Sequence, residues 1–121
     1  MYKRQPLGCA AANASLDLLE KEPHKYLSLE EKHLSHLIKI QKLPYIKKIR
    51  VSGTISAFDL EIGNKKGYFN NIGKEIKIRA MEKGLFIRPL GNVIYLLPPL
   101  CITDDQLEKS YWIISQILDN L

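Results

Sequence analysis

The sequence has 121 residues, with 18 Lys or Arg against 13 Asp or Glu, which gives a formal net charge of +5. A chain of this length accommodates one domain and leaves no room for a second. Hydrophobic residues form 45% of it, enough for a core, and no apolar run reaches the roughly 20 residues of a membrane helix, so wholesale disorder and a spanning segment are both excluded.

Two helices are predicted in the first third of the chain. Residues 7–21 are rich in Ala and Leu, and Pro23 is expected to end this first helix. A second helix is expected to begin near Ser28, because Ser28 and Glu31 have the spacing of a capping box, and to stop before Pro44. Its buried face is expected to be Leu34, Leu37 and Ile38.

Strands are predicted in the middle of the chain. Apolar and polar residues alternate over 46–62, with a bend at residues 52–53, and residues 63–73 have the composition of a loop. A third helix is predicted over 74–83, closed by Gly84. Two apolar strands, 85–88 and 93–97, are expected to flank a turn at 89–92.

The last helix has the clearest pattern. Thr103 and Gln106 have capping-box spacing, and an apolar stripe then recurs every three or four residues. Its members are Leu107, Tyr111, Ile114, Leu118 and Leu121. We therefore predict an α+β fold, with an N-terminal helix followed by helices on one face of a small, mainly antiparallel sheet.

A basic stripe occupies the interval between Glu31 and Asp59, which contains no acidic residue. It carries Lys32, Lys39, Lys42, Lys47, Lys48 and Arg50, beside His33 and His36. Such a stripe can attract nucleic acid or an acidic partner, but no nucleic-acid motif accompanies it, so a solvated surface is the simpler interpretation. The two histidines share a helix face but lack a third ligand at zinc-site spacing, so we interpret them as surface residues and predict no metal site.

Other candidates for chemistry are few. Cys9 and Cys101 are too few for a disulfide framework and are expected to be buried thiols of a reduced, cytoplasmic protein. Residues 63–67 (GNKKG) resemble a phosphate loop only loosely. Arg88 ends an apolar strand before a turn, where its guanidinium could bind a carboxylate with two parallel hydrogen bonds, although composition alone favours an ordinary strand-end arginine.

Three stretches carry a resemblance to a known family. Residues 6–12 (PLGCAAA) resemble a conserved segment of the class III pyridoxal-phosphate-dependent aminotransferases. Residues 84–99 (GLFIRPLGNVIYLLPP) resemble the C-terminal hairpin of the branch that works in biotin biosynthesis, and residues 50–55 with 102–103 fit the same alignment. The resemblance covers the whole chain but only the C-terminal part of such an enzyme.

The resemblance implies a fold, a reaction and one site residue. Residues 1–22 would be a remnant of the interdomain helix region, and residues 23–121 the small C-terminal domain of a fold-type I aminotransferase. The family enzymes are homodimers, and this branch converts 8-amino-7-oxononanoate to 7,8-diaminononanoate with S-adenosylmethionine as amino donor. Arg88 matches the arginine that binds the substrate carboxylate.

The same resemblance implies that the cofactor is held elsewhere. Pyridoxal phosphate is linked to a lysine of the large domain, and no lysine of this chain matches that motif. Family residues that approach the cofactor phosphate would align with Met1 and Gln5. We therefore expect no catalytic and no cofactor-binding residue, no bound pyridoxal phosphate and no transaminase activity from this chain alone.

Three hypotheses follow. The leading one is a C-terminal fragment of the biotin-pathway transaminase. The second is one half of a split aminotransferase, complemented by a separate large-domain chain. The third, for which nucleic acid would be the partner, is a small basic binding module.

Overall fold

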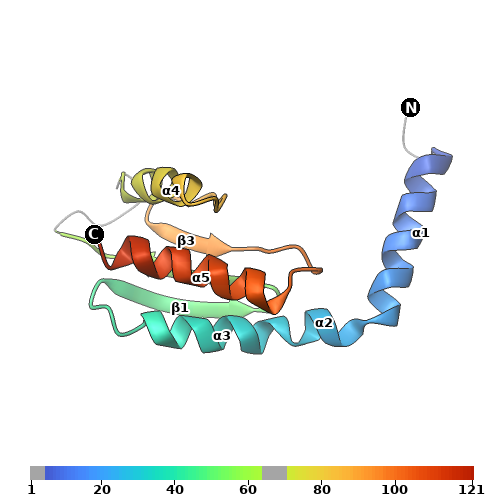
Figure 1. The fold of residues 1–121 in the computed structure, drawn as a ribbon, viewed down its shortest axis with the longest axis horizontal. Coiled ribbons are helices and arrows are strands. Elements are labelled where there is room, and N and C mark those ends of the chain that lie inside the picture. Colours follow the sequence, from blue (N-terminus) through green and yellow to red (C-terminus); the bar gives the residue numbers. More distant parts are fainter. Residues whose placement is uncertain (1–4, 64–70) are drawn as a thin grey trace.

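The computed structural model describes residues 5–63 and 71–121. Met1 and most of the 63–67 loop lie outside them. In chain order the elements are α1 (Pro6–Lys21), α2 (Pro23–Leu27), α3 (Leu29–Ile40), β1 (Ile46–Ser52), β2 (Ile55–Leu60), α4 (Ile72–Glu82), β3 (Val93–Leu96) and α5 (Asp104–Leu118). Figure 1 shows α1 projecting away from a body that contains all the other elements except the connecting α2.

The sheet is antiparallel and three-stranded, in the order β1-β2-β3. β1 and β2 form a hairpin in which Ser52 pairs with Ile55, and Gly53 takes a φ of 57° in the tight turn. That positive φ explains why the bend predicted at residues 52–53 contains a glycine. A bulge between Lys47 and Arg50 places Lys48 at a φ of 50°, which was not predicted.

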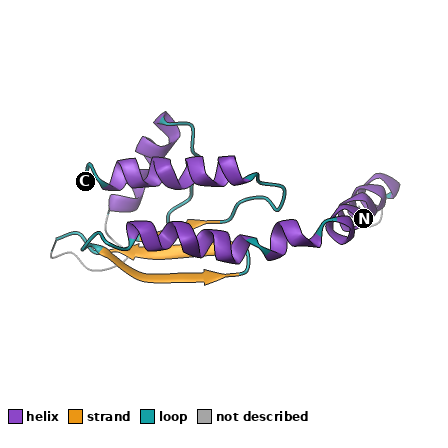
Figure 2. Cartoon of the chain, turned by 60° about the horizontal axis from the view of Figure 1, so that its bottom comes forward, coloured by secondary structure: helices purple, strands orange, loops and turns teal. Residues whose placement is uncertain are grey.

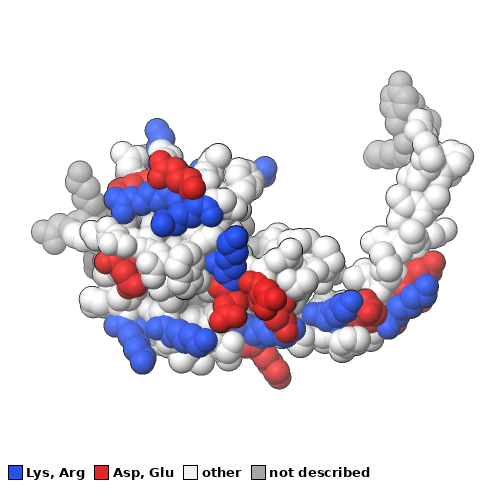
Figure 3. Space-filling model, viewed as in Figure 1, with Lys and Arg blue, Asp and Glu red and all other residues white. Residues whose placement is uncertain are grey.

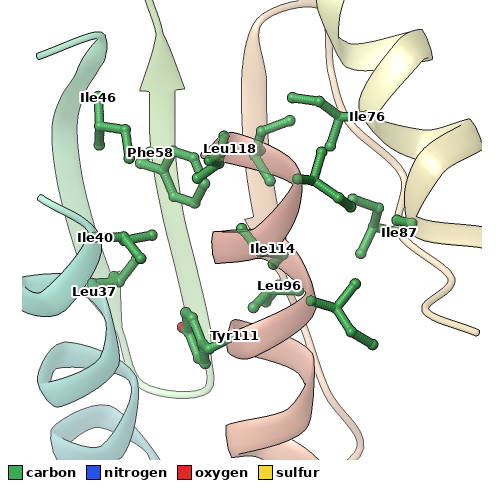
Figure 4. Packing of buried hydrophobic residues seen from close by; sticks show 14 of the residues in the cluster. Leu37, Ile40, Ile46, Phe58, Ile76, Ile87, Leu96, Tyr111, Ile114 and Leu118 are labelled. Atoms are coloured by element: carbon green, nitrogen blue, oxygen red, sulfur yellow. The ribbon is translucent and has the colours of Figure 1, made fainter. Parts of the chain in front are cut away.

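The helices α3 and α5 cover one face of the sheet, as Figure 2 shows, and α4 packs beside α5. The core lies between these layers and is drawn in Figure 4. Phe58, Ile94 and Ile114 are at most 1% exposed, so strand and helix side chains interdigitate without solvent. The α+β prediction is confirmed.

α1 spans almost the residues predicted for it but buries none of them. Leu7 is 83% exposed, and Leu16 and Leu18 are more than half exposed. Cys9 on this helix and Cys101 are both exposed, so the prediction of buried thiols was wrong. In the part of the chain that the structure describes, the apolar surface of α1 is left uncovered. The apolar composition of this helix is visible in the sequence, but its exposure is not. The helix break at Pro23 was right, although Pro23 also begins the short α2.

The buried face of α3 differs from the prediction. Leu37 is buried as expected, but Leu34 and Ile38 are 46% and 53% exposed. The face on the sheet is instead Leu29, His33, Leu37 and Ile40. The capping box predicted at Ser28 is also absent: this residue has helical φ and ψ, because α2 precedes it directly, and its side chain makes no cap hydrogen bond.

The C-terminal half follows the prediction more closely. α4, β3 and α5 are confirmed, and the capping box of Thr103 and Gln106 is present. The α5 stripe is buried from Leu107 to Leu118, whereas Leu121 is 40% exposed. Residues 85–88 do not form a strand; they run as extended chain, and the turn after them is closed by a single bridge between Leu90 and Val93.

Candidate functional site

Arg88 lies in an extended segment whose side chains alternate between core and solvent. Ile87 is 4% exposed and anchors the segment in the core, while its neighbours Phe86 and Arg88 both point outward. The Arg88 Cζ atom lies 5.3 Å from the centroid of the Phe86 ring. This cation–π geometry follows from the two-residue spacing of extended chain.

The turn after Arg88 is tied to the sheet. The backbone groups of Leu90 and Val93 exchange two hydrogen bonds of 2.9 Å, and Gly91 within the turn has a φ of 62°. The side-chain amide of Asn92 donates to the carbonyl of Leu60 at the end of β2, at 3.0 Å. The predicted turn therefore exists and fixes the backbone next to Arg88.

The N-terminal turn of α4 packs directly against the same turn. A Cβ atom built on Gly73 would lie 2.1 Å from the carbonyl oxygen of Gly91 and 3.0 Å from Cβ of Pro89. Only glycine allows this approach without moving backbone. One helical turn later, Lys77 places its Nζ atom 5.9 Å from the Phe86 ring centroid, so α4 also reaches the side chain that faces Arg88.

A groove of about 410 Å³ opens beside Arg88. Its walls are mainly apolar and come from the 85–88 segment, β3, the two prolines after β3 and the start of α5. The described lining includes Phe86, Arg88, Leu97, Pro98, Ile102 and Leu107, and no acidic residue. The guanidinium is exposed and has no hydrogen bond or ion pair within residues 5–63 and 71–121. Such a group, free beside an apolar groove, can bind a carboxylate that carries an aliphatic chain.

The residues around Arg88 do not make a pyridoxal phosphate site. The cofactor needs a lysine for the Schiff base and a carboxylate near its ring nitrogen. The described lining of the groove supplies neither. Gln5 is exposed and precedes α1, the helix that projects from the body in Figure 1, and Met1 lies outside the described residues. The described residues of this chain therefore support no chemical step on the cofactor.

The histidine pair does not lie on the surface as predicted. His33 is fully buried; its Nε2 donates to the carbonyl of Thr54 at 3.1 Å, so its Nδ1 accepts a hydrogen bond from the Tyr111 hydroxyl at 2.6 Å. The buried Ser56 hydroxyl lies 2.6 Å from the same Tyr111 oxygen. His36 is half-buried and stacks on the Tyr111 ring at 4.8 Å. Among the described residues no three potential metal ligands cluster.

Burial sets the protonation states of this network. Desolvation lowers the pKa of His33, against the opposing effect of the Thr54 carbonyl, and desolvation likewise lowers the pKa of His36. Desolvation raises the pKa of Tyr111 to about 12, although the Ser56 hydrogen bond opposes this. The network is therefore neutral near pH 7 and serves to connect α3, β2 and α5.

Three of the six cations in the basic stripe, Lys32, Lys48 and Arg50, pair with acids in the described structure. The Lys32 ammonium lies 2.6 Å from Asp104 on α5, and Arg50 lies 2.8 Å from the carboxylate of Asp59, which Lys48 approaches at 3.7 Å. Figure 3 shows acidic and basic side chains interspersed on one face of the body. This arrangement gives the nucleic-acid hypothesis no support. No helix within residues 5–63 and 71–121 is long and apolar enough to cross a membrane.

Sequence comparison identifies the family to which the chain is related. The model of aminotransferase class III matches residues 2–118. The adenosylmethionine-8-amino-7-oxononanoate aminotransferase of Synechococcus elongatus is 42% identical over 120 residues, which are 99% of this chain and 28% of that relative. The enzymes of the same name from Geobacter sulfurreducens and Helicobacter pylori are 37% and 33% identical. They are covered over 25% and 28% of their length, so the chain spans about a quarter of these curated relatives.

Solved structures agree with this relation. The adenosylmethionine-8-amino-7-oxononanoate aminotransferase of Methanocaldococcus jannaschii superposes with a TM-score of 0.74 at 27% identity, over 96% of this chain and 30% of that one. A structure described as a transaminase with L-ala reaches a TM-score of 0.85 at 20% identity, over 95% of this chain and 28% of that one, which shows the shared fold. The resemblance read from residues 6–12 and 84–99 is thereby confirmed.

Proposed function

Because the chain belongs to the class III aminotransferase family, we propose that it is the carboxylate-binding small domain of a biotin-pathway transaminase, acting on 8-amino-7-oxononanoate. The observation that carries this proposal is Arg88, whose exposed guanidinium has no acidic partner in the described structure and borders an apolar groove. The carboxylate would pair with the guanidinium, and the aliphatic chain would lie along the groove.

The role of Arg88 is to bind and orient. Charge-assisted hydrogen bonds to a carboxylate contribute about 1.5–3 kcal/mol, and the planar fork of arginine fixes the plane of the carboxylate as well as its distance. The Asn92 and Gly73 contacts described above fix the backbone that carries this fork. Orienting one end of the substrate positions its other end for the reacting centre.

The proposed test is a titration of the ¹⁵N-labelled chain with 8-amino-7-oxononanoate. We expect the side-chain Nε–H signal of Arg88 to move with the free acid and not with its methyl ester. Arg88→Gln is expected to weaken binding at least tenfold, in line with the energy of a charged hydrogen bond. If the Arg88 signal responds equally to acid and ester, carboxylate binding by Arg88 is wrong.

Arg79 provides the matched control. It is also a partly exposed arginine, but it already bonds to Glu75 and to the carbonyl of Asn120. Arg79→Gln should therefore leave the affinity within twofold of the unaltered chain. An equal loss in both variants would mean that the titration measures net charge and not a site.

We further propose that these 121 residues alone do not catalyse transamination, because none of their lysines matches the Schiff-base motif of the family. Pyridoxal phosphate is accordingly expected to form no specific adduct with the isolated chain. Borohydride trapping of the cofactor on one lysine, together with turnover, would overturn this.

We also propose a cytoplasmic location for the protein. This location was expected from the two cysteines, which are free thiols in the structure.

As a second candidate we propose that a separate large-domain chain complements this one, with the exposed surface of α1 as part of the interface. α1 contains no buried residue and exposes several leucines, and apolar surface of this kind is typical of an interface. A separately produced large domain from a relative is expected to gain turnover when this chain is added. No gain with the folded chain in excess would end the hypothesis for that pair.

A further inference from the structure

Phe86 is an unusual residue for its position. Its ring is 61% exposed although it lies beside a groove with apolar walls. Its neighbours fix the backbone on both sides: the amide of Leu85 donates to the Ala80 carbonyl at 2.8 Å, and Ile87 is buried in the core. The ring is thus held at the surface by its neighbours and not by its own burial.

Two cations face this ring. Arg88 Cζ lies 5.3 Å and Lys77 Nζ 5.9 Å from its centroid, both within the range of a cation–π interaction. The two cations come from different elements, the 85–88 segment and α4. Phe86 therefore links the arginine of the candidate site to the helix that packs against its turn.

The Arg88 side chain has no other partner of this kind in the described structure. A free arginine side chain carries about 2 kcal/mol of rotamer entropy, much of which is lost when it binds a ligand. A contact that already restricts the guanidinium in the free protein reduces that loss and so increases affinity.

We propose that Phe86 is the positioning residue of the carboxylate site, holding the Arg88 guanidinium beside the groove before ligand binds. This inference rests on the proposed function of Arg88, which it deepens. Phe86 itself need not touch the carboxylate. An exposed cation–π contact of ordinary strength corresponds to an affinity effect of about two- to fivefold.

The experiment uses the ¹⁵N-labelled 121-residue chain, with hexanoate as an aliphatic carboxylate and hexanamide as its neutral counterpart. Phe86→Leu removes the aromatic face but keeps an apolar side chain, and Phe86→Tyr restores the face. Trp112→Leu is the matched control, because Trp112 is 57% exposed and lies on α5 outside the lining of this groove.

Two measurements are made on each variant. In the ligand-free chain, the ring current of Phe86 should shift the Arg88 side-chain protons, and Phe86→Leu should abolish this shift. The dissociation constant for hexanoate should rise about two- to fivefold in Phe86→Leu. It should return to its original value in Phe86→Tyr and stay unchanged in Trp112→Leu.

The outcomes separate this inference from the function on which it rests. If Arg88 responds no more to hexanoate than to hexanamide in the unaltered chain, carboxylate binding itself is wrong. If Arg88 responds but Phe86→Leu binds hexanoate as well as the original, the positioning role alone is wrong. A loss of affinity that Phe86→Tyr does not restore also refutes it, because the effect then follows from packing and not from the aromatic face.

Discussion

Removal of the Tyr111 hydroxyl should cost this fold more than removal of a hydroxyl at a partly exposed position. The Tyr111 hydroxyl lies between two side chains that are themselves buried, with Ser56 Oγ and His33 Nδ1 each at 2.6 Å. Ser56 is 1% exposed and His33 is 0% exposed. Tyr111→Phe keeps the ring and its stacking on His36 but deletes the oxygen that both partners use.

The magnitude follows from the number of groups left without a partner. A buried polar group that loses its hydrogen bond costs about 1–3 kcal/mol, and two such groups remain after Tyr111→Phe. A serine hydroxyl can rotate in search of another acceptor, so the lower part of this range is expected for Ser56. We therefore expect the free energy of unfolding to fall by about 2–4 kcal/mol, out of roughly 6–18 kcal/mol typical for a domain of this length.

Urea denaturation followed by circular dichroism measures this loss. With an m-value of about 2 kcal/mol per molar, the midpoint should move down by about 1–2 M. Tyr45→Phe is the control, because the Tyr45 hydroxyl donates to a single acceptor, the Leu118 carbonyl, from a partly exposed position. A loss below about 0.5 kcal/mol for Tyr111→Phe, or one equal to that of Tyr45→Phe, would refute the reasoning.

Three further predictions concern stability. Burial lowers the pKa of His33 below its ordinary 6.5, so below pH 6.5 the unfolded chain binds more protons than the folded one. Urea titrations should therefore show stability falling there by up to about 1.4 kcal/mol per pH unit from His33, with a further contribution from His36, and levelling off under the lowered pKa values. A pH-independent midpoint contradicts this. Gly73→Ala should cost about 1–3 kcal/mol in thermal unfolding, because the added Cβ would meet the Gly91 carbonyl. Gly8→Ala is the control and should be neutral or stabilising, because a Cβ there meets open space. Equal effects of the two substitutions would disprove the contact. In urea denaturation, Thr103→Ala should lower the free energy of unfolding by about 1 kcal/mol, because the Thr103 side chain makes its cap hydrogen bond. Ser28→Ala should change it by almost nothing, because the Ser28 side chain makes no cap hydrogen bond. A larger loss for Ser28→Ala than for Thr103→Ala would be inconsistent with the two helix starts.

Local sequence signals were reliable where the physics is local. The capping box at Thr103 and the glycine turns at Gly53 and Gly84 depend on residues within a few positions, and the structure confirms them. The same spacing failed at Ser28, because the chain preceding it is helical and leaves no free amides for a cap. A motif predicts a cap only where the preceding chain is not itself a helix.

Burial on α3 was mispredicted for a different reason. Leu34 and Ile38 are apolar and have helical spacing, yet His33 takes the buried face. The reason lies in Tyr111 and Thr54, which are distant in sequence and satisfy both ring nitrogens of His33. A hydrophobicity scale ranks a side chain by its own free energy of transfer from water, without regard to its partners. A histidine whose two ring nitrogens are both hydrogen-bonded in the fold loses little free energy on burial.

The candidate site was also predictable from the sequence only in part. Sequence alone singled out Arg88 and the turn after it, and the resemblance of residues 84–99 gave the arginine a role that the structure leaves as a proposal. Residues 85–88 were interpreted as an apolar strand of the sheet, which they are not, so the position of Phe86 beside Arg88 was not predicted. The contact of the following turn with α4, through Gly73, could be found only in three dimensions.

The sequence by itself determined the family, most of the helices and strands and the position of Arg88, since each depends on a motif or a periodicity within one segment. The tertiary structure decided which faces are buried, which cations are neutralised by acids and what surrounds the guanidinium. These depend on side chains brought together from separate elements, as Lys32 is to Asp104 and Phe86 to Lys77. No spacing along one segment encodes such pairs, because they form only when the elements pack.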